Sequence, residues 1–363
     1  MGQRAGAEHL VVIARQPRAA GSEGEGAARE HAASVLRDAG FTIEIERFEY
    51  SALPGRFGTP AGSALALVTV LLASWLATAQ DAPRAAALVL IGGLVLLAIV
   101  ARRMLGDGVL TIPWLRRSGE NLVARRGDEP PRVWLVAHLD SKSQPIPSVV
   151  RVAAIVLLAI GVVLAVVALA TTLVPGSSRM LWWVSVVASI GGAIPAMLSV
   201  VGNDSDGAVD NASGVAAVLA AVELLPRELT IGVLMPSAEE LGLAGARAFA
   251  RDGASPAIAL NCDGVDDHGA LTIMYTGRRP DSVVRALERV ASRAPRVRRM
   301  PLGLLTDSVA LADAGWRTVT VSRGSLATLR RVHTRRDSLD SLRGDGIHEV
   351  STLLARAAEA LSR

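Results

Sequence analysis

Four segments of the chain are apolar on every face, without the 3.6-residue period that marks an amphipathic helix packed on a soluble core. They span residues 61–79, 85–101, 149–174 and 180–201. Each is close to the roughly 20 residues that a helix needs to cross a bilayer. The connections QDAPR and PGSSR are short, so the pattern predicts two transmembrane helical hairpins. Buried helices of one large core are the alternative, above all for the last segment, where GGAIP weakens a helix.

Outside these segments, strand-like and helix-like stretches alternate. FTIEIERFEY has the alternating polarity of a half-exposed strand, and RVWLVAH is apolar throughout, as a buried strand is. The later predicted helices span residues 212–225, 241–251, 281–294 and 347–361, and the later predicted strands span 229–235, 257–261 and 318–322. Such alternation predicts an α/β fold in which a mostly parallel central sheet carries helices on both faces, a three-layer α/β/α sandwich. In that architecture, sites form at the carboxyl ends of the strands.

The composition favours a membrane protein. Half of the 363 residues are hydrophobic and the mean hydropathy is +0.37, although aromatic residues make up only 3%, so the excess consists of Ala, Val and Leu. That is too apolar for an ordinary soluble domain. The net charge of +4 is carried almost entirely by arginine, and no basic run has interleaved aromatic residues, so nucleic acid is not expected as a partner. The single cysteine, Cys262, excludes an intramolecular disulfide, and the N-terminal stretch is too charged for a secretory signal.

Acidic and histidine residues gather where predicted strands end. His138 and Asp140 close RVWLVAHLD, Glu239 and Glu240 follow LTIGVLM, and Asp263 follows AIALN. Taken singly, each has an ordinary explanation, such as a satisfied buried histidine or a charged first helical turn favoured by the helix dipole. Taken together, they would crowd one edge of the sheet.

Two further candidates, Asp210 in GAVDNASG and His333 in HTRRD, lie in predicted loops. By itself, Asp210 is equally explained as a turn or helix-capping residue. Beside the strand-end carboxylates it completes a cluster in which two carboxylates about 4 Å apart would repel by about 4 kcal/mol at an effective dielectric constant of about 20. Divalent cations remove that cost. Histidine nitrogen and carboxylate oxygen, without thiolate, are ligands that suit hydrolytic zinc.

Five motifs resemble, in their order, the di-zinc aminopeptidases of metallopeptidase family 28: H-x-D, G-A-x-D-N-A-S-G, S-A-E-E-x-G-L-x-G, N-x-D and H-T-x-x-D. The stretch RAAGSEGEGAAREHAASVLRDAGFTIEIERFEY is also similar to the opening helix and strand of that family. The resemblance covers nearly all of the chain outside the apolar segments. It implies a zinc-exopeptidase-like sandwich, interrupted here by two hairpins that soluble members lack.

The resemblance implies that Asp210 bridges two Zn²⁺ ions. One zinc would bind Glu240 and His333, and the other would bind His138 and Asp263. A hydroxide shared by the two ions would be the nucleophile, because zinc lowers the pKa of bound water from about 15.7 to about 7. An open position at each zinc is the arrangement of catalytic sites.

Neighbouring acids take supporting roles in the same interpretation. Glu239 would be the general base that passes the proton to the leaving amine. Asp140 would accept the second ring N–H of the histidine two residues before it. Asp337 would do the same for the histidine four residues before it, or would cap the helix that follows. Asp307 matches an acidic position of the family but is equally explained as a helix N-cap.

The predicted hairpins divide the chain into five parts. Parts of the peptidase domain span residues 1–59, 103–148 and 202–363, and the hairpins span 60–102 and 149–201. An even number of crossings returns the chain to the side from which it started. The motifs before and after the second hairpin can therefore still meet.

Arginines near the apolar segments predict the orientation in the membrane. Those on the catalytic side outnumber those at the hairpin turns, where only Arg84 and Arg179 lie. The catalytic-side arginines are Arg56, Arg102, Arg103, Arg116, Arg117 and Arg151. The positive-inside rule then places the peptidase domain in the cytoplasm, with the outward-facing orientation as the alternative.

The sequence therefore predicts a membrane-anchored di-zinc metallopeptidase, an aminopeptidase that acts on short peptides near the bilayer. A glutaminyl-cyclase-like acyltransferase and a catalytically inactive binding protein on the same fold are the alternatives. A transporter is disfavoured, because the apolar segments hold almost no ionisable residue that would mark a substrate path.

Overall fold

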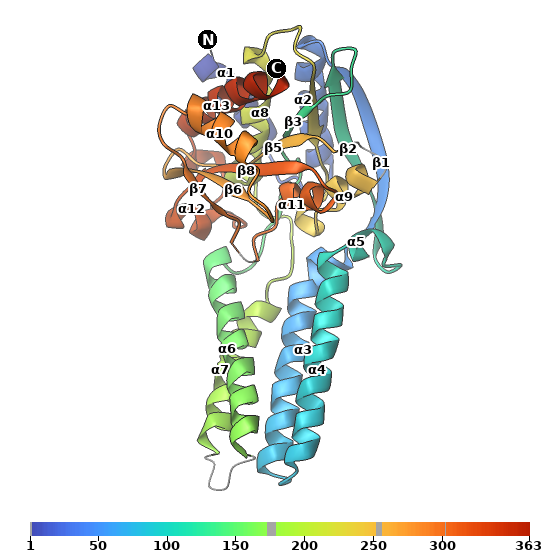
Figure 1. Ribbon diagram of the computed structural model, residues 1–363, viewed down its shortest axis with the longest axis vertical. Helices are drawn as coiled ribbons and strands as arrows, with labels where there is room; N and C mark the ends of the chain where they lie inside the picture. The colour runs from blue at the N-terminus through green and yellow to red at the C-terminus, as the bar shows by residue number, and fades with distance from the viewer. Residues whose placement is uncertain (1, 173–178, 252–255, 302) are drawn as a thin grey trace. The chain divides into compact units, whose positions relative to one another are not determined.

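The computed structural model describes residues 2–172, 179–251, 256–301 and 303–363 (Figure 1). The chain forms two compact units. The first, the sheet unit, comprises Met1–Ala52, Leu110–Ser143 and Gly202–Arg363. The second, the helical unit, comprises Leu53–Val109 and Gln144–Val201. Both units are therefore assembled from segments that are separate in sequence.

The sheet unit contains an eight-stranded sheet with the order β1-β2-β4-β3-β5-β8-β6-β7. The strands are β1 (Thr42–Ser51), β2 (Arg116–Arg126), β3 (Val133–Val136), β4 (Ile231–Met235), β5 (Ile258–Val265), β6 (Ala270–Tyr275), β7 (Arg296–Arg299) and β8 (Arg317–Gly324). The four central strands, β4, β3, β5 and β8, run parallel to one another. The predicted parallel sheet is found in this block.

The outer strands make the sheet mixed. β1 and β2 pair antiparallel, as do β2 with β4 and β6 with β8, whereas β6 and β7 are parallel. A parallel pair needs a crossover of about a dozen residues or more. The connection between β5 and β6, residues 266–269, is too short for one, so β6 runs opposite to the central block.

Helices cover both faces of the sheet. Alternate residues of β2 and β3 point to opposite sides, as the period of a strand requires. Leu122 and Leu135 belong to a large core that includes residues of α1, α2, α8, α10 and α13. Val123 and Trp134 belong to a smaller core with Phe249 of α9 and Leu311 of α11. The sheet unit therefore has three layers.

The helices of the sheet unit follow the predicted alternation with strands, with additional short elements. They are α1 (Gly2–Ile13), α2 (Glu23–Asp38), α8 (Ser213–Leu224), α9 (Ala244–Arg251), α10 (Asp281–Val290), α11 (Asp307–Asp313), α12 (Leu326–Arg331) and α13 (Asp345–Ser362), with the short turns η1 (Ala208–Ala212), η2 (Glu239–Leu241) and η3 (Leu339–Ser341). The short helix α5 (Gly108–Thr111) contains the sequence boundary between the two units.

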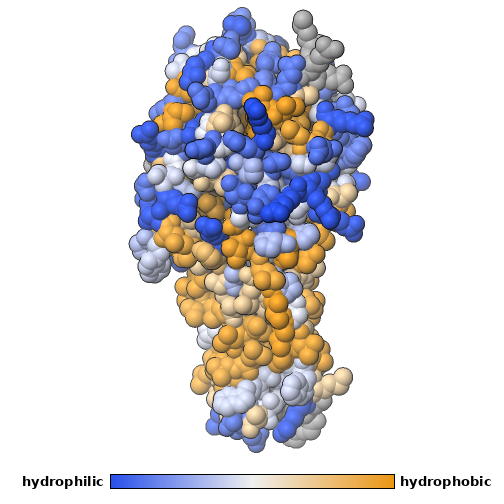
Figure 2. All heavy atoms as spheres, turned by 180° about the vertical axis from the view of Figure 1, so that it is seen from behind, coloured by the Kyte–Doolittle hydropathy of each residue, from blue (hydrophilic) through white to orange (hydrophobic). Residues whose placement is uncertain are grey.

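The helical unit consists of α3 (Leu53–Thr78), α4 (Pro83–Leu105), α6 (Ser148–Thr172) and α7 (Met180–Met197). All four are long and apolar enough to cross a membrane. Figure 2 shows hydrophobic side chains over the surface of these helices, where Leu88 is 75% exposed. The four predicted apolar segments are therefore helices. The last two residues of the third segment, 173–174, and most of the connection PGSSR lie outside the described residues.

Close helix contacts hold the helical unit together. Gly161 of α6 faces α7, and Ser185 Oγ donates a hydrogen bond to the Gly161 carbonyl at 2.7 Å. A Cβ atom at Gly161 would lie only 2.3 Å from Ser189 Oγ. Small residues at this crossing let the two backbones approach, as is typical of helix pairs in membranes.

Candidate metal centre

Five of the predicted side chains come together at the carboxyl ends of the central strands. His138 follows β3, Glu240 lies in η2 after β4, and Asp263 lies near the end of β5. Asp210 lies in η1 ahead of α8, and His333 follows α12. Because β4, β3 and β5 are parallel neighbours, their carboxyl ends share one edge of the sheet.

Asp210 lies between two groups of potential ligands. Its Oδ1 atom is 3.3 Å from His138 Nε2, which is in turn 3.9 Å from Asp263 Oδ1. Its Oδ2 atom is 2.8 Å from His333 Nε2, which is 3.3 Å from Glu240 Oε1. Each group offers three ligand atoms within 4.8 Å of one another, and Asp210 belongs to both. This is the arrangement that a carboxylate bridging two cations requires.

The donor set fits a pair of zinc ions. The ligand atoms are imidazole nitrogen and carboxylate oxygen, the hard and borderline donors that zinc accepts in hydrolytic sites. Glu240 Oε1 is buried and has no hydrogen-bond partner among the described residues. It lies 3.3 Å from His333 Nε2, and a metal ion bound there would satisfy it. Cys262 is adjacent to Asp263 in sequence, but its side chain belongs to the hydrophobic core on the other side of the strand.

The pKa values of two carboxylates in the cluster shift in opposite directions. Burial alone would raise the pKa of Asp210, but hydrogen bonds from His138 and His333 hold it well below its ordinary value. Burial and the neighbouring charge of Glu240 raise the pKa of Glu239 well above its ordinary value. Glu239 is only 7% exposed, and its Oε2 atom lies 4.0 Å from His138 Nε2. A buried carboxylate of raised pKa beside the ligands is suited to general base catalysis.

Asp140 fixes the turn that carries the two glutamates. Its Oδ1 atom accepts the backbone N–H of Glu239 at 3.0 Å, and its Oδ2 atom accepts that of Glu240 at 3.1 Å. Ala238 begins this turn in the left-handed region, at φ 56°. The ring Nδ1 of His138 lies 3.0 Å from the backbone carbonyl of Asp140 and 3.6 Å from its carboxylate. The imidazole of His138 therefore lies closer to the backbone carbonyl of Asp140 than to its carboxylate. The carboxylate instead accepts the two backbone N–H groups of the turn that carries the glutamates.

Asp337 fixes the backbone around Asp210. Its carboxylate accepts the N–H groups of Val209 at 2.7 Å and Asp210 at 3.1 Å. Burial raises its pKa to about 6. In the sequence it was expected to orient His333 or to cap a helix, but the residue that precedes η3 is Ser338. The carboxylate of Asp337 instead holds a segment more than a hundred positions earlier in the chain.

A family model for peptidase family M28 matches residues 121–358. The chain belongs to peptidase family M28. The resemblance that the five motifs indicated is therefore confirmed. A search of the curated proteins finds no significant match.

Solved structures share the fold of this M28 chain. An aminopeptidase from Aneurinibacillus sp. strain AM-1 is similar with 14% identity and a TM-score of 0.57, over 99% of this chain and 93% of that one. A zinc aminopeptidase from Bacillus subtilis has 14% identity and a TM-score of 0.56, over 99% and 95%. A glutaminyl cyclase from Bacteroides thetaiotaomicron has 12% identity and a TM-score of 0.56, over 98% and 96%. At such identities the likeness concerns the fold.

Two charged residues beside the cluster, Lys142 and Arg18, were not identified as site residues by the sequence analysis. Lys142 Nζ forms an ion pair with Glu240 Oε2. Arg18 is fully buried and donates to the carbonyls of Leu139 and Gly207, so it joins the segments on which His138 and Asp210 lie. Burial lowers its pKa to about 10. The only signals in the sequence were the position of the lysine just after H-x-D and of the arginine in the opening motif.

Asp307 is a buried acid beside the same site. The sequence allowed Asp307 as a helix N-cap, but the N-cap of α11 is Thr306, and Asp307 is the first residue of the helix. However, neither of its carboxylate oxygens has a hydrogen-bond partner among the described residues. Burial raises its pKa to about 8. Its side chain is therefore not explained by capping.

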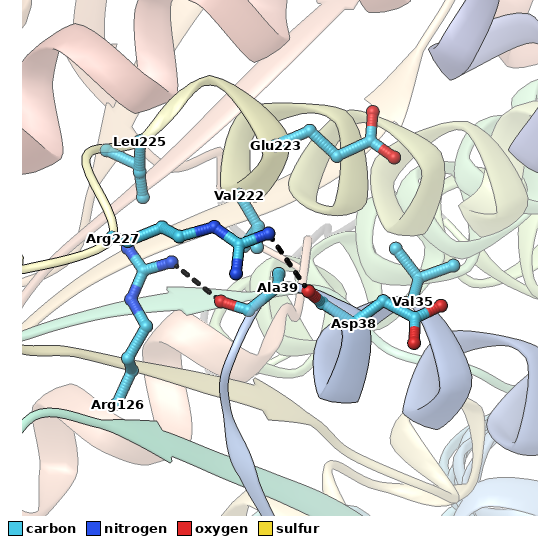
Figure 3. Close-up of a pocket in the computed structure, with 8 residues that line it drawn as sticks. All are labelled: Val35, Asp38, Ala39, Arg126, Val222, Glu223, Leu225 and Arg227. Carbon is cyan, nitrogen blue, oxygen red and sulfur yellow. Dashed lines mark hydrogen bonds between the residues drawn. The ribbon is translucent and has the colours of Figure 1, made fainter.

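A pocket of about 340 Å³ lies apart from the metal centre, between the ends of α2 and α8 (Figure 3). Arg126 donates to the carbonyl of Ala39 at 3.0 Å, and Arg227 donates to that of Asp38 at 3.4 Å. The last carbonyls of a helix lack partners within it and attract cations. The arginines of this pocket are thus explained by the helix end that they satisfy.

Proposed function

We propose that this M28 chain is a membrane-anchored di-zinc metallopeptidase, an aminopeptidase that acts on short peptides. One observation carries the proposal: Asp210 offers one carboxylate oxygen to the group of His138 and Asp263 and the other to the group of Glu240 and His333. Neither a helix cap nor a turn requires one carboxylate to face two separate groups of potential metal ligands.

In this proposal each residue of the two groups is a zinc ligand. His138 and Asp263 would hold one ion, Glu240 and His333 the other, and Asp210 both. Bound there, zinc would polarise a peptide carbonyl and make water acidic enough to attack at neutral pH. Three carboxylates from the chain would balance most of the charge of the two cations.

Glu239 is the proposed general base. It takes a proton from the attacking water as the new C–O bond forms and delivers that proton to the amide nitrogen as the C–N bond breaks. The products are a carboxylate and an amine. Because Glu239 is buried, bulk water has little access to its carboxylate. The hydrogen bond from its backbone N–H to Asp140 keeps its backbone fixed beside His138.

The helical unit supplies the proposed membrane anchor. Its four helices have the length and apolar composition for a bilayer, and their exposed side chains include Leu88 and Val187. The distribution of arginines around these helices favours a cytoplasmic peptidase domain. A peptide substrate and the lipid bilayer are then the two partners of the chain.

Hydrolysis of a substrate panel by detergent-solubilised protein tests the activity. The panel contains dipeptides and tripeptides with free or acetylated N-termini and with free or amidated C-termini. An aminopeptidase cleaves the substrates with a free N-terminus and spares the acetylated ones. Cleavage that depends instead on a free C-terminus would contradict the assignment.

A glutaminyl cyclase is the second candidate, because chains with that activity share the fold. A peptide with N-terminal glutamine separates the two, since cyclisation releases ammonia and keeps the peptide bond, whereas hydrolysis releases glutamine. Absence of both reactions in zinc-loaded protein would favour an inactive binding protein on the same fold.

A further inference from the structure

Lys142 is the only lysine of the chain; every other residue among the 38 lysines and arginines is arginine. It lies in the segment after β3, next to the bridge between Ser143 and Gly202. Its side chain is only 13% exposed, and its Nζ atom contacts Glu240 Oε2. A chain that uses arginine at all other cationic positions therefore places its one side-chain ammonium group on a candidate metal ligand.

The two oxygens of Glu240 have different surroundings. Oε2 accepts from Lys142. Oε1 is buried, has no hydrogen-bond partner among the described residues and lies 3.3 Å from His333 Nε2, in the group that includes Asp210. The contact with Lys142 thus fixes the carboxylate in the rotation that presents Oε1 to the ligand group. The neighbouring Glu239 lies instead beside His138.

The shapes of the two basic side chains explain why lysine suits this position and arginine does not. An ammonium group is a compact point charge that can rest on one carboxylate oxygen. A guanidinium group is a planar fork that binds both oxygens of a carboxylate at once. At position 142, arginine would therefore compete with a metal ion for Glu240.

We propose that Lys142 is a positioning residue that holds Glu240 by one oxygen and thereby keeps the other oxygen available to the zinc site of Asp210, Glu240 and His333. This inference rests on the proposed di-zinc function. It assigns different roles to the adjacent glutamates, because Lys142 contacts one carboxylate oxygen of Glu240 whereas Glu239 lies beside His138.

Zinc binding to the solubilised full-length protein tests this role without reference to activity. Equilibrium dialysis with metal analysis, supported by the absorption spectrum of the cobalt-substituted protein, gives the affinity of each site. The wild type should bind two ions per chain. Lys142→Arg and Lys142→Met should each keep the first ion and bind the second about 10- to 100-fold more weakly, the range typical when a partner of a metal ligand is lost. Arg335→Met, which removes an exposed cation paired with Asp204, should leave both affinities unchanged.

Chemical restoration of the ammonium group separates positioning from a general structural effect. In Lys142→Cys the new thiol can be alkylated with 2-bromoethylamine, which forms a C–S bond, releases bromide and yields a side chain of nearly the same length as lysine. The native Cys262 is fully buried, so the treated wild type is the control. Alkylation should restore the affinity for the second ion.

Three results would overturn the inference. Equal second-site affinity in Lys142→Arg and the wild type would remove the need for an ammonium group. Tighter binding in Lys142→Met would show that the lysine merely competes with the ion. Failure of alkylation to restore binding would assign the loss to the surrounding fold. A wild type that binds fewer than two ions would instead contradict the di-zinc function itself, and this result is seen before any variant is compared.

Discussion

The carboxylate of Asp140 accepts a hydrogen bond of 3.0 Å from the backbone N–H of Glu239, a residue nearly a hundred positions away in the chain. Its second oxygen accepts the next N–H group of the same turn. The position of the proposed base is therefore set by an acid that follows a different strand. Hydrogen bonds of this kind, between a charged acceptor and two backbone donors, are among the stronger ones in proteins.

Replacing that acceptor should damage both folding and catalysis. In Asp140→Asn one backbone N–H would face an amide NH₂ group instead of an oxygen, which leaves a buried donor without a partner. We expect a loss of about 1–3 kcal/mol of unfolding free energy and a lower kcat. Denaturant unfolding and steady-state kinetics measure the two effects. Asp204→Asn, at an exposed ion pair, is the control, and equal behaviour of the two variants would contradict the role of Asp140.

Glu239→Gln should abolish proton transfer while leaving the ligands in place. The amide keeps the shape of the side chain but cannot accept the proton of water, so kcat should fall by about 100- to 10,000-fold. Zinc content, measured by metal analysis, should equal that of the wild type. Glu240→Gln is the matched control at the adjacent position, and it should lose zinc. A Glu239→Gln variant with wild-type turnover would exclude this residue as the base.

The buried Glu25 should make stability depend on pH. Burial and the charge of Asp140 raise its pKa from 4.5 to about 7. The folded state therefore favours the protonated form, so the contribution of this group is greatest below pH 4.5 and is lost as the pH rises to about 7. The shift corresponds to at most about 3 kcal/mol.

Glu25→Gln isolates that contribution. Glutamine retains an oxygen that can accept the N–H of Gly21, which Glu25 accepts at 2.7 Å. The variant should gain stability relative to the wild type as the pH rises between 4.5 and about 7 and show a constant difference on either side of that window. Unfolding followed by tryptophan fluorescence at several pH values tests this, and a pH-independent difference would contradict it.

Two glycines of the helical unit should respond differently to the same substitution. At Gly161 a Cβ atom would lie 2.8 Å from the backbone N of Ser189, whereas at Gly92 nothing lies within 4 Å. Gly161→Ala should therefore lower the unfolding free energy of the detergent-solubilised protein by about 1–3 kcal/mol through overpacking, and its melting temperature should fall. Gly92→Ala should be neutral or slightly stabilising, because alanine favours a helix by about 1 kcal/mol over glycine. Equal melting temperatures for the two variants would disprove the close contact.

Much of the fold followed from patterns that a sequence displays directly. The four apolar segments could be predicted as helices because each is about as long as a membrane-spanning helix and a helix satisfies its own backbone groups. The buried strands and the side chains at their ends followed from the rule that parallel strands share one edge. His138, Glu240 and Asp263 could be placed in this way, and the loop residues Asp210 and His333 were added by the order of the motifs.

Features that depend on backbone orientation could not be predicted. The strand RVRR, residues 296–299, has no apolar alternation because it is an exposed edge strand, and it was missed. The beginning of α3 at Leu53 precedes the predicted segment, because the helix continues through polar residues and Pro60. The roles of Asp140 and Asp337 required knowledge of which N–H groups point inward, and a sequence does not show that direction.

The discontinuity of the sheet unit imposes an order on its biosynthesis. The last residue of β1, Ser51, pairs with Arg116 across the whole of α3 and α4, and His138 precedes α6 and α7 while Asp210 follows them. A ribosome must therefore finish both pairs of helices before the two halves of the candidate metal centre exist in one molecule. Until then the nascent chain carries only part of the proposed ligand set, so the proposed activity cannot arise before both pairs of helices have been made.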